Sequence, residues 1–493
     1  MSTPESHVRP LLRLPSGIPG LDGILSGGFP KAGITILQGT PGAGKTIFGN
    51  QLCHHHVRNG GKAIYVTLLA ESHARMLLHM SQLRFFDPSM VPERLYLISA
   101  FRVLEENGLK GLQDLLRREV QRFGATVLVL DGLVAAEESA GTAREFKKFI
   151  HELQTQASMT DCTMFLLTGV QSRMISPEHT MVDGVIELRC DAVDHEAIRT
   201  LTVHKMRGVA MIGGRHALKI TSEGLEVFPR LEAVAPDVRE QSAEFVPISS
   251  GLPPLDAMVG GGLPSASTTL VVGPAGVGKT TLGLHFLSHC TAAEPGVFLG
   301  LYETPRSLAM KAETLNLPVG RLMRDGVVEV LWFPTTEGLV DEVCTRLLEA
   351  SRRRGVRRVF IDGLGGLQSL MHDPRRLSRV LAALSIAFQH LSATTVITAE
   401  SAAAGGIHDL PLDGLSLHGV SAVAQNIVMM RYVELRNRLH RALSALKVRN
   451  GPVDPQMRLF KMTGAGIEID PDAMAVERVL AQADAARRGF TQG

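Results

Sequence analysis

An eight-residue phosphate-binding motif occurs twice in the chain, and this repetition constrains the fold more than any other feature. Both copies fit the pattern G-x-x-x-x-G-K-[ST]. An apolar run precedes each copy, at 34–37 and at 269–272, and a helical pattern follows. Strand, glycine-rich loop and helix is the context that the motif requires. The residues of the two copies are Gly39, Thr40, Pro41, Gly42, Ala43, Gly44, Lys45 and Thr46, and then Gly273, Pro274, Ala275, Gly276, Val277, Gly278, Lys279, Thr280 and the adjoining Thr281.

Each residue type in such a loop has a physical task. Glycines allow backbone angles at which successive N–H groups point at one phosphate, and the start of the following helix adds its dipole. We expect Lys45 and Lys279 to contact the β- and γ-phosphates, and Thr46 and Thr280 to hold Mg²⁺. A glycine-rich turn without a ligand is the alternative. Two matches in the same context favour two nucleoside triphosphate sites.

The motif belongs to a longer internal repeat. When the sequence is shifted by 234 places, the distance from Lys45 to Lys279, a lead-in of the form S-G-[IL]-P-x-L-D also superposes, at 16–22 and 250–256. A G-G-x-P turn superposes as well. Self-similarity of this kind indicates two copies of one domain. The predicted boundaries are a first domain at 1–227, a linker at 228–247, a second domain at 248–473 and a helical or loose tail at 474–493.

Apolar strands alternate with helical patterns inside each copy. In the first copy, the pattern predicts an amphipathic helix at 109–123, and buried runs at 126–130 and 162–168 flank a helical stretch at 143–157. Continuous apolar strands between helices predict a mainly parallel sheet that is covered on both faces. Longer alternating strands then predict an antiparallel β edge, at 184–189, 198–206 and 216–227. The expected fold class is therefore α/β, with two tandem RecA-like phosphate-loop domains.

Composition excludes several classes of protein. At 493 residues the chain exceeds what one core supports, so about two domains are expected. No run of 18 apolar residues exists and residues 1–10 lack a signal-peptide core, which predicts no membrane segment. Five scattered cysteines indicate a reducing compartment, so a cytoplasmic protein is expected. A formal charge of +2 gives no general attraction for nucleic acid.

Hydrolysis of a nucleotide needs a carboxylate beside Mg²⁺. Asp131 and Asp362 each end an apolar strand, and the carboxyl ends of parallel strands meet at the loop edge of the sheet. We therefore expect both aspartates on the Mg²⁺ side of their sites. The alternative is an aspartate that caps the next helix.

Hydrolysis also needs a group that activates water. In RecA-like ATPases this acid follows the strand after the loop helix, where Glu71 and Glu303 are the acids available. Each of them could instead be an acid at a helix N-terminus, favoured by the helix dipole. The catalytic role is the preferred interpretation of both.

A basic triplet lies on a strand near the end of each copy: Lys205-Met206-Arg207, and Lys447-Val448-Arg449. Alternation places the lysine and the arginine of each triplet on one face of the strand. Two adjacent cations are stabilised by a facing anion, and the γ-phosphate of a neighbouring subunit is suitable, as in an arginine finger. A solvated edge strand is the alternative. A second basic run, 352–358, is interpreted as a solvated helix end in preference to a nucleic-acid patch.

Together these features resemble the KaiC family of double-domain ATPases, which includes the ATPase of the circadian clock. The resemblance covers about residues 14–469. It implies two stacked RecA-like rings in a homohexamer, ATP at every subunit interface, slow hydrolysis, and Ser/Thr autophosphorylation in the C-terminal ring. It also implies a signalling or timing role with regulatory protein partners. The segments that are most specific for the resemblance are the two lead-ins, Lys205-Met206-Arg207-Gly208 with 220–229, and 432–436 leading to Lys447-Val448-Arg449.

Three places depart from the family pattern. The family usually has two adjacent glutamates after the second strand of each domain, and here one glutamate of each pair is replaced. If the replaced glutamate is the base, both hydrolysis and kinase activity would be reduced. One phosphoacceptor hydroxyl is missing, which leaves Ser421 as the candidate phosphoacceptor. One threonine is missing from the first loop. The sequences at these places read Ala70-Glu71 and Tyr302-Glu303, Ser421-Ala422, and Gly44-Lys45-Thr46-Ile47.

Two other function classes fit part of this pattern. A RecA- or RadA-like nucleic-acid-dependent ATPase would share the loops, but an aromatic content of 5% argues against stacking platforms for bases. A non-catalytic switch, in which ATP only holds subunits together, would account for Ala70 and Tyr302. Measurement of turnover separates this switch from an enzyme.

Overall fold

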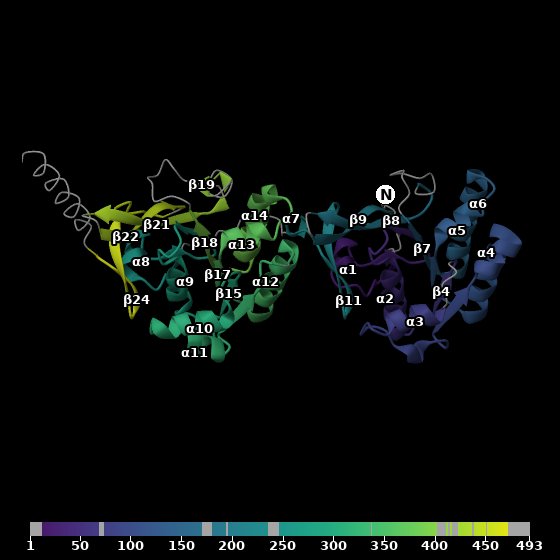
Figure 1. The fold of residues 1–493 in the computed structure, drawn as a ribbon, viewed down its shortest axis with the longest axis horizontal. Coiled ribbons are helices and arrows are strands. Elements are labelled where there is room, and N and C mark those ends of the chain that lie inside the picture. Colours follow the sequence, from purple (N-terminus) through teal and green to yellow (C-terminus); the bar gives the residue numbers. More distant parts are fainter. Residues whose placement is uncertain are drawn as a thin grey trace, which may run out of the picture. The chain divides into compact units, whose positions relative to one another are not determined.

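The computed structural model of the chain describes residues 12–68, 73–169, 180–193, 196–234, 246–336, 338–401, 411–412, 415–416, 423–435, 438–449 and 451–471. The chain divides into two compact units between Val234 and Ala235. Each unit contains a nine-stranded sheet with helices on both faces (Figure 1). The predicted α/β class with tandem RecA-like domains is confirmed. No helix in the described part of the chain is long and apolar enough to span a bilayer.

The sheet of the first unit has the strand order β11-β10-β9-β8-β3-β7-β6-β4-β5. The strands from β8 to β5 are parallel, and β8 to β11 form an antiparallel meander. The predicted hairpins therefore lie at one edge of a parallel sheet. The strands are β3 (Ile34–Gly39), β4 (Ala63–Thr67), β5 (Leu95–Ser99), β6 (Val127–Asp131), β7 (Thr163–Gly169), β8 (Gly184–Val193), β9 (Glu196–Met206), β10 (Arg215–Thr221) and β11 (Gly224–Phe228).

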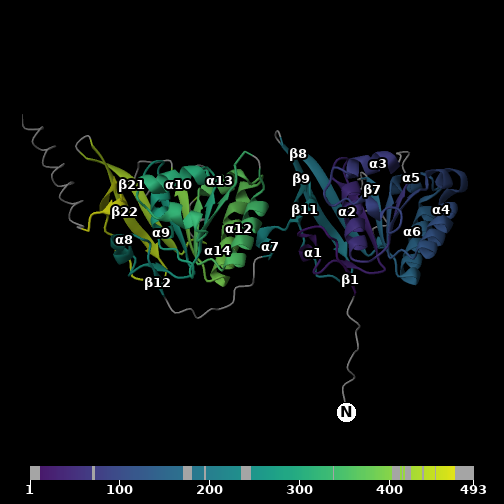
Figure 2. The same cartoon turned by 90° about the horizontal axis from the view of Figure 1, so that it is seen from below.

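Helices cover both faces of this sheet (Figure 2). One core cluster joins the sheet to α2 and α3, through side chains such as Phe48 and Met76, and the other joins it to α4 and α6, through Leu112 and Phe149. This two-sided burial explains why the central strands are apolar throughout. The helices are α1 (Leu21–Ile24), α2 (Lys45–Arg58), α3 (His73–Met80), α4 (Phe101–Phe123), α5 (Leu133–Glu138), α6 (Ala143–Thr160) and α7 (Leu231–Val234).

The second unit repeats this arrangement, with the strand order β16-β15-β17-β18-β14-β21-β22-β23-β24. The strands from β16 to β21 are parallel, and the remaining pairs are antiparallel. The strands are β14 (Thr268–Gly273), β15 (Gly296–Gly300), β16 (Val328–Trp332), β17 (Arg358–Asp362), β18 (Thr394–Glu400), β21 (Asn426–Leu435), β22 (Arg438–Val448), β23 (Arg458–Thr463) and β24 (Gly466–Ile469).

The helices of the second unit also lie on both sides of its sheet (Figure 1). Helices α9 and α10 share one core cluster with the sheet, while α12 and α14 contact each other and the strands β15 and β18. Three two-stranded ribbons complete the described fold, β1/β2 (Arg13–Leu14, Phe29–Pro30), β12/β13 (Pro247–Ile248, Leu263–Pro264) and β19/β20 (Pro411–Leu412, Leu415–Ser416). The helices are α8 (Pro253–Met258), α9 (Lys279–Leu287), α10 (Pro305–Thr314), α11 (Val319–Arg324), α12 (Val340–Arg354), α13 (Leu364–Ser369) and α14 (Leu377–His390).

The repeated lead-in forms the same local structure in both units. The backbone N–H of Ser16 donates to the Asp22 carboxylate at 2.9 Å, and that of Ser250 donates to Asp256 at 2.8 Å. The serine and aspartate of the motif therefore close a turn that leads into α1 and α8. Gly17 has φ 69°, and a Cβ there would lie 2.2 Å from the ring of His55, so only glycine fits at this position.

The structure differs from the sequence prediction in three elements. The predicted strand at 216–227 is two strands, because Gly224, with φ 112°, closes a two-residue turn opposite Thr221. Strand β24 follows a similar turn and was not predicted. Helix α4 begins at Phe101, and non-helical backbone at Gly108 separates its first turns from the predicted segment 109–123. The tail at 474–493 lies outside the described residues.

Candidate functional site

The phosphate loops lie at the same place in both units, between a central strand and the helix that follows it. β3 leads through 40–44 into α2, and β14 leads through 274–278 into α9. Gly42 and Gly44 have φ of 74° and 101°, and Gly276 and Gly278 have φ of 72° and 120°. Side chains rarely adopt these angles, which explains the glycines of the motif.

The loop lysines lie over their own loops. The Nζ of Lys45 donates to the carbonyls of Gly39 and Thr40 at 2.7 and 3.1 Å. The Nζ of Lys279 donates to those of Gly273 and Pro274 at 2.7 and 2.8 Å. Burial lowers the pKa of both ammonium groups, and nearby carboxylates oppose this effect. Each ammonium thus lies at the mouth of its loop, where a phosphate would meet it.

The loop threonines contact the strand-end aspartates. Thr46 Oγ1 donates to Asp131 Oδ2 at 3.1 Å, and Thr280 Oγ1 donates to Asp362 Oδ2 at 2.8 Å. The next helices, α5 and α13, have Gly132 and Gly363 as their N-cap residues. Burial raises the pKa of Asp362, while its threonine partners lower it. A hydroxyl beside a carboxylate is the hard oxygen donor set that Mg²⁺ prefers, so the residues of both sites fit this ion.

A second hydroxyl contacts each aspartate, and it comes from a different strand in each unit. In the first unit, the buried Tyr65 of β4 donates to Asp131 Oδ2 at 2.7 Å. In the second unit, Phe298 occupies the position of Tyr65, and Thr398 of β18 donates to Asp362 Oδ1 at 2.5 Å. Neither contact was predicted, because both depend on the register between strands far apart in the sequence.

The two candidate water-activating glutamates differ in what the structure describes. Glu71 lies outside the described residues. Glu303 follows β15, forms an ion pair with Lys311 of α10, and lies close enough to Asp362 to raise the pKa of that carboxyl. Its Oε2 is buried and has no hydrogen-bond partner among the residues that the structure describes. Thr304 caps α10, so Glu303 lies outside the helix it precedes. Tyr302 beside it is 64% exposed.

The basic triplets lie at the end of the sheet where the parallel strands begin, whereas the phosphate loop of the same unit lies at the end where these strands finish. Met206 pairs with Gly184, which pairs with Thr35 near the start of β3. Four residues of strand, about 13 Å, separate this level from Gly39. The side chains of Lys205 and Arg207 lie still farther from the loop, where both donate to the Thr180 carbonyl, at 3.0 and 2.8 Å.

The second unit has the same geometry. Val448 pairs with Asn426, which pairs with Thr269 near the start of β14. Lys447 Nζ donates to the Ala424 carbonyl at 2.8 Å. β9 and β22 each have neighbours on both sides, but the outer neighbours pair only at 200–202 and at 441–443. In the described registers Lys205 and Lys447 are therefore paired on one side only, by β8 and β21. Arg449 follows β22 at the same edge of the sheet, and its backbone N–H donates to Gln425.

An arginine on each antiparallel hairpin lies near the loop of its own unit. Arg199 of β9 donates through Nε to the Gly42 carbonyl at 3.3 Å. The equivalent Arg441 of β22 lies over the Tyr432 ring at 5.5 Å, and the Tyr432 hydroxyl lies beside Gly276. These arginines have no signal in the sequence, since only the pairing of β8 with β9 and of β21 with β22 brings them to the loop.

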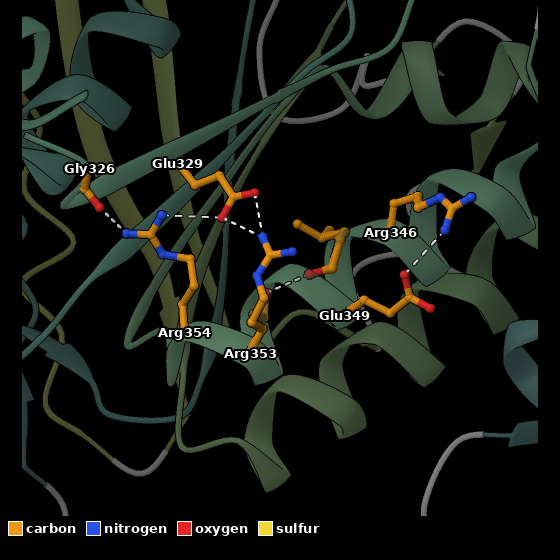
Figure 3. Close-up of polar contacts among 8 residues, drawn as sticks. Gly326, Glu329, Arg346, Glu349, Arg353 and Arg354 are labelled. Atoms are coloured by element: carbon orange, nitrogen blue, oxygen red, sulfur yellow. Dashed lines mark hydrogen bonds and ion pairs between the residues drawn. The ribbon is translucent and has the colours of Figure 1, made fainter. Parts of the chain in front are cut away.

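The basic run at the end of α12 is partly neutralised within its own unit (Figure 3). Glu329 of β16 accepts hydrogen bonds from Arg353 at 2.9 and 3.0 Å and from Arg354 at 3.2 Å, and Arg354 also donates to the Gly326 carbonyl. Arg358 is buried and donates to the Ser249 carbonyl at 2.7 Å. These contacts account for part of the run without a ligand. The candidate phosphoacceptor Ser421 lies outside the described residues.

Comparison with known proteins agrees with this geometry. The family model of the KaiC ATPase matches the chain twice, at residues 14–232 and 248–474. The circadian clock oscillator protein KaiC of Parathermosynechococcus lividus is 25% identical over 97% of this chain and 90% of its own length. The protein of that name from Prochlorococcus marinus (strain MIT 9313) is 26% identical over 97% of this chain and 96% of its own length. The chain therefore belongs to the KaiC family of ATPases.

Proposed function

We propose that the chain is an ATPase that binds ATP and Mg²⁺ at both loops and works as a homo-oligomeric ring, with six subunits as in the family's hexamers. The observation that carries this proposal is the position of the basic triplets. Each triplet lies at the opposite end of the strands from the phosphate loop of its own unit. Neither triplet therefore reaches a nucleotide bound at that loop. A second subunit that brings a triplet to the loop would complete the site.

Each residue then has a defined task. The loop N–H groups and Lys45 or Lys279 bind the phosphates. Thr46 with Asp131, and Thr280 with Asp362, hold Mg²⁺, which when bound neutralises charge that develops on the phosphate oxygens. Glu71 and Glu303 orient the attacking water. Lys205 with Arg207, or Lys447 with Arg449, stabilises the transition state from the neighbouring subunit.

The role of hydrolysis is inferred to be regulatory. The curated relatives are named circadian clock oscillator proteins, and a ring whose ATP state changes its assembly is suited to signalling to protein partners. Autophosphorylation on Ser421 should be slow or absent, because Tyr302 stands where the family has a second carboxylate. A phenol with a pKa of about 10 is a poor base at neutral pH.

Subunit mixing tests the action in trans. Arg449→Ala subunits keep an intact second loop, and Lys279→Ala subunits keep an intact basic triplet. Second-site hydrolysis is measured as the phosphate release in excess of that from a ring made only of Lys279→Ala subunits. Each variant alone should lose this second-site hydrolysis. A mixed ring contains some interfaces in which an intact loop meets an intact triplet, so it should recover part of the activity. Arg438→Ala, at an exposed position of the same strand, is the matched control.

Three results would contradict the proposal. No recovery in mixed rings, with assembly verified by sizing in ATP and Mg²⁺, would favour a structural role for the triplets. Nucleotide-dependent assembly without any phosphate release would favour the non-catalytic switch. Turnover that requires DNA or RNA, and falls steeply with salt, would favour the nucleic-acid motor.

A further inference from the structure

A carboxylate that the proposed mechanism does not use lies at the second phosphate loop. β18 ends at Glu400, which pairs with Gly273, the first residue of the loop. The N–H of the next residue, Ser401, donates to the Gly273 carbonyl at 3.2 Å. Strand β18 is therefore fixed against the loop up to its last residue, and the position of Glu400 is set by the sheet.

Alternation places the Glu400 side chain on the nucleotide side of the sheet. Residues two apart on a strand share a face, and Thr398 on that face donates to Asp362. Asp362 in turn contacts Thr280, at the start of α9. Glu400 continues this face beyond Thr398, toward the loop, and its charge opposes the burial that lowers the pKa of Lys279.

Of the three carboxylates at this site, Glu400 has the fewest hydrogen bonds and ion pairs within the described part of the chain. Asp362 accepts hydrogen bonds from two threonines, and Glu303 is paired with Lys311. The Glu400 side chain is exposed, and within the described part of the chain it receives no hydrogen bond. It also lies near Tyr302, whose pKa is raised by burial and by the Glu400 charge, so that even less of this phenol is ionised and able to act as a base at neutral pH.

At the equivalent strand end the first unit has a glycine in place of this acid. There β7 ends at Gly169, which pairs with Gly39 at the start of the first loop, as Glu400 pairs with Gly273. The two sites therefore have equivalent strand ends but different chemistry. An acid at this point is not required to build the loop, because the first unit forms the same loop without one.

We propose that Glu400 is a second catalytic carboxylate, which accepts a proton from the water that attacks the γ-phosphate at the second loop. The water oxygen bonds to the γ-phosphorus as the bond from that phosphorus to the β–γ bridging oxygen breaks. One proton of the water passes to the Glu400 carboxylate, and ADP and phosphate leave. This inference rests on the proposed ATPase function. Glu400 would accept the proton from water in place of the second carboxylate of the family, whose position Tyr302 occupies in this chain.

The test uses the full-length chain carrying Glu400→Gln. Second-site turnover is the phosphate release in excess of that of a Lys279→Ala chain, and bound nucleotide per chain is measured in parallel. A general base contributes roughly a hundredfold or more, so the variant should release phosphate no faster than Lys279→Ala. It should still bind two nucleotides, with unchanged or higher affinity, because a negative charge near the phosphates has been removed. Glu400→Asp should retain partial activity.

Glu349→Gln is the matched control. It removes an exposed carboxylate on α12 that pairs with Arg346, and it should behave as the parent (Figure 3). Second-site turnover within threefold of the parent in Glu400→Gln would overturn the inference. A loss of ATP affinity as large as the loss of turnover would also overturn it, since Glu400 would then be a binding residue. Failure of the ATPase proposal itself is recognised separately, in a parent chain that binds or hydrolyses no ATP.

Discussion

Replacement of Tyr65 by phenylalanine should weaken Mg²⁺ binding at the first site while leaving the fold intact. The Tyr65 ring is fully buried, and its hydroxyl contacts Asp131 at 2.7 Å. Phenylalanine already occupies the equivalent position, Phe298, in the second unit, so the ring alone is compatible with this sheet. The substitution therefore removes the hydroxyl, with its hydrogen bonds to Asp131 and Thr46, and leaves the packed ring in place.

The magnitude follows from the charge of the acceptor. A hydrogen bond to a charged group contributes roughly 1.5–3 kcal/mol, against about 1 for a neutral pair. Because Thr46 still donates to Asp131 at 3.1 Å, the aspartate keeps one oriented contact and the lower end of that range applies. About 1.4 kcal/mol is tenfold in an equilibrium constant. Loss of a group that orients a metal ligand typically costs 10–100-fold in metal affinity, which agrees with this value.

The assay is a Mg²⁺ titration of nucleotide binding to a chain that carries Lys279→Ala, so that only the first loop binds. The Mg²⁺ midpoint should rise about tenfold in Tyr65→Phe. Tyr96→Phe removes a tyrosine hydroxyl whose contact is with Arg122, and it should leave the midpoint unchanged. A shift below twofold in Tyr65→Phe would refute the reasoning. At the second site, Thr398→Val should act like Tyr65→Phe, and added Phe298→Tyr should restore part of the loss.

Three further results are expected. Lys45→Ala and Lys279→Ala each remove a contact to phosphate worth roughly 1.5–3 kcal/mol, so equilibrium dialysis should show bound nucleotide falling from two to about one per chain; two in both variants would contradict the two-site assignment. Burial raises the pKa of Asp362, so this group contributes stability that is complete below its unfolded pKa of about 3.9 and is lost as pH rises through the raised value. The melting temperature of nucleotide-free Asp362→Asn should therefore be higher than that of the parent at neutral pH. A difference in melting temperature that does not shrink as pH falls toward about 4 would be evidence against this. Ser421 should be phosphorylated slowly or not at all in ATP and Mg²⁺; rapid phosphate there on peptide mapping, absent in Lys279→Ala, would show that Glu303 suffices as the base.

The sequence predicted the features that short-range patterns encode. Apolar strands such as 126–130 lie between helices because both faces of the sheet are buried, and this pattern is visible without any partner. The repeat at 234 places predicted two similar domains, and the fold class is confirmed. Asp131 and Asp362 were singled out because each ends such a strand, and in the structure each contacts the loop threonine.

The features that the sequence did not predict depend on register between distant strands. Thr398 reaches Asp362 because β17 and β18 are neighbours, and Arg199 reaches Gly42 because the β8–β9 hairpin returns at the loop. A shift of one residue in either pairing would turn these side chains to the other face. No local pattern states that register, so these residues had no signal in the sequence.

The differences between the two sites follow a rule. Both units share the loop, its lysine, the threonine–aspartate contact and the distant triplet, which are the parts proposed to bind ATP and to complete a site across an interface. They differ at the strand end that pairs with the first residue of the loop, which is Gly169 in the first unit and Glu400 in the second. Binding and assembly are thus built alike at both sites, while the group that would accept a proton is not. We therefore expect the two loops to bind ATP similarly and to hydrolyse it at different rates, with the carboxylate at the end of β18 as the cause.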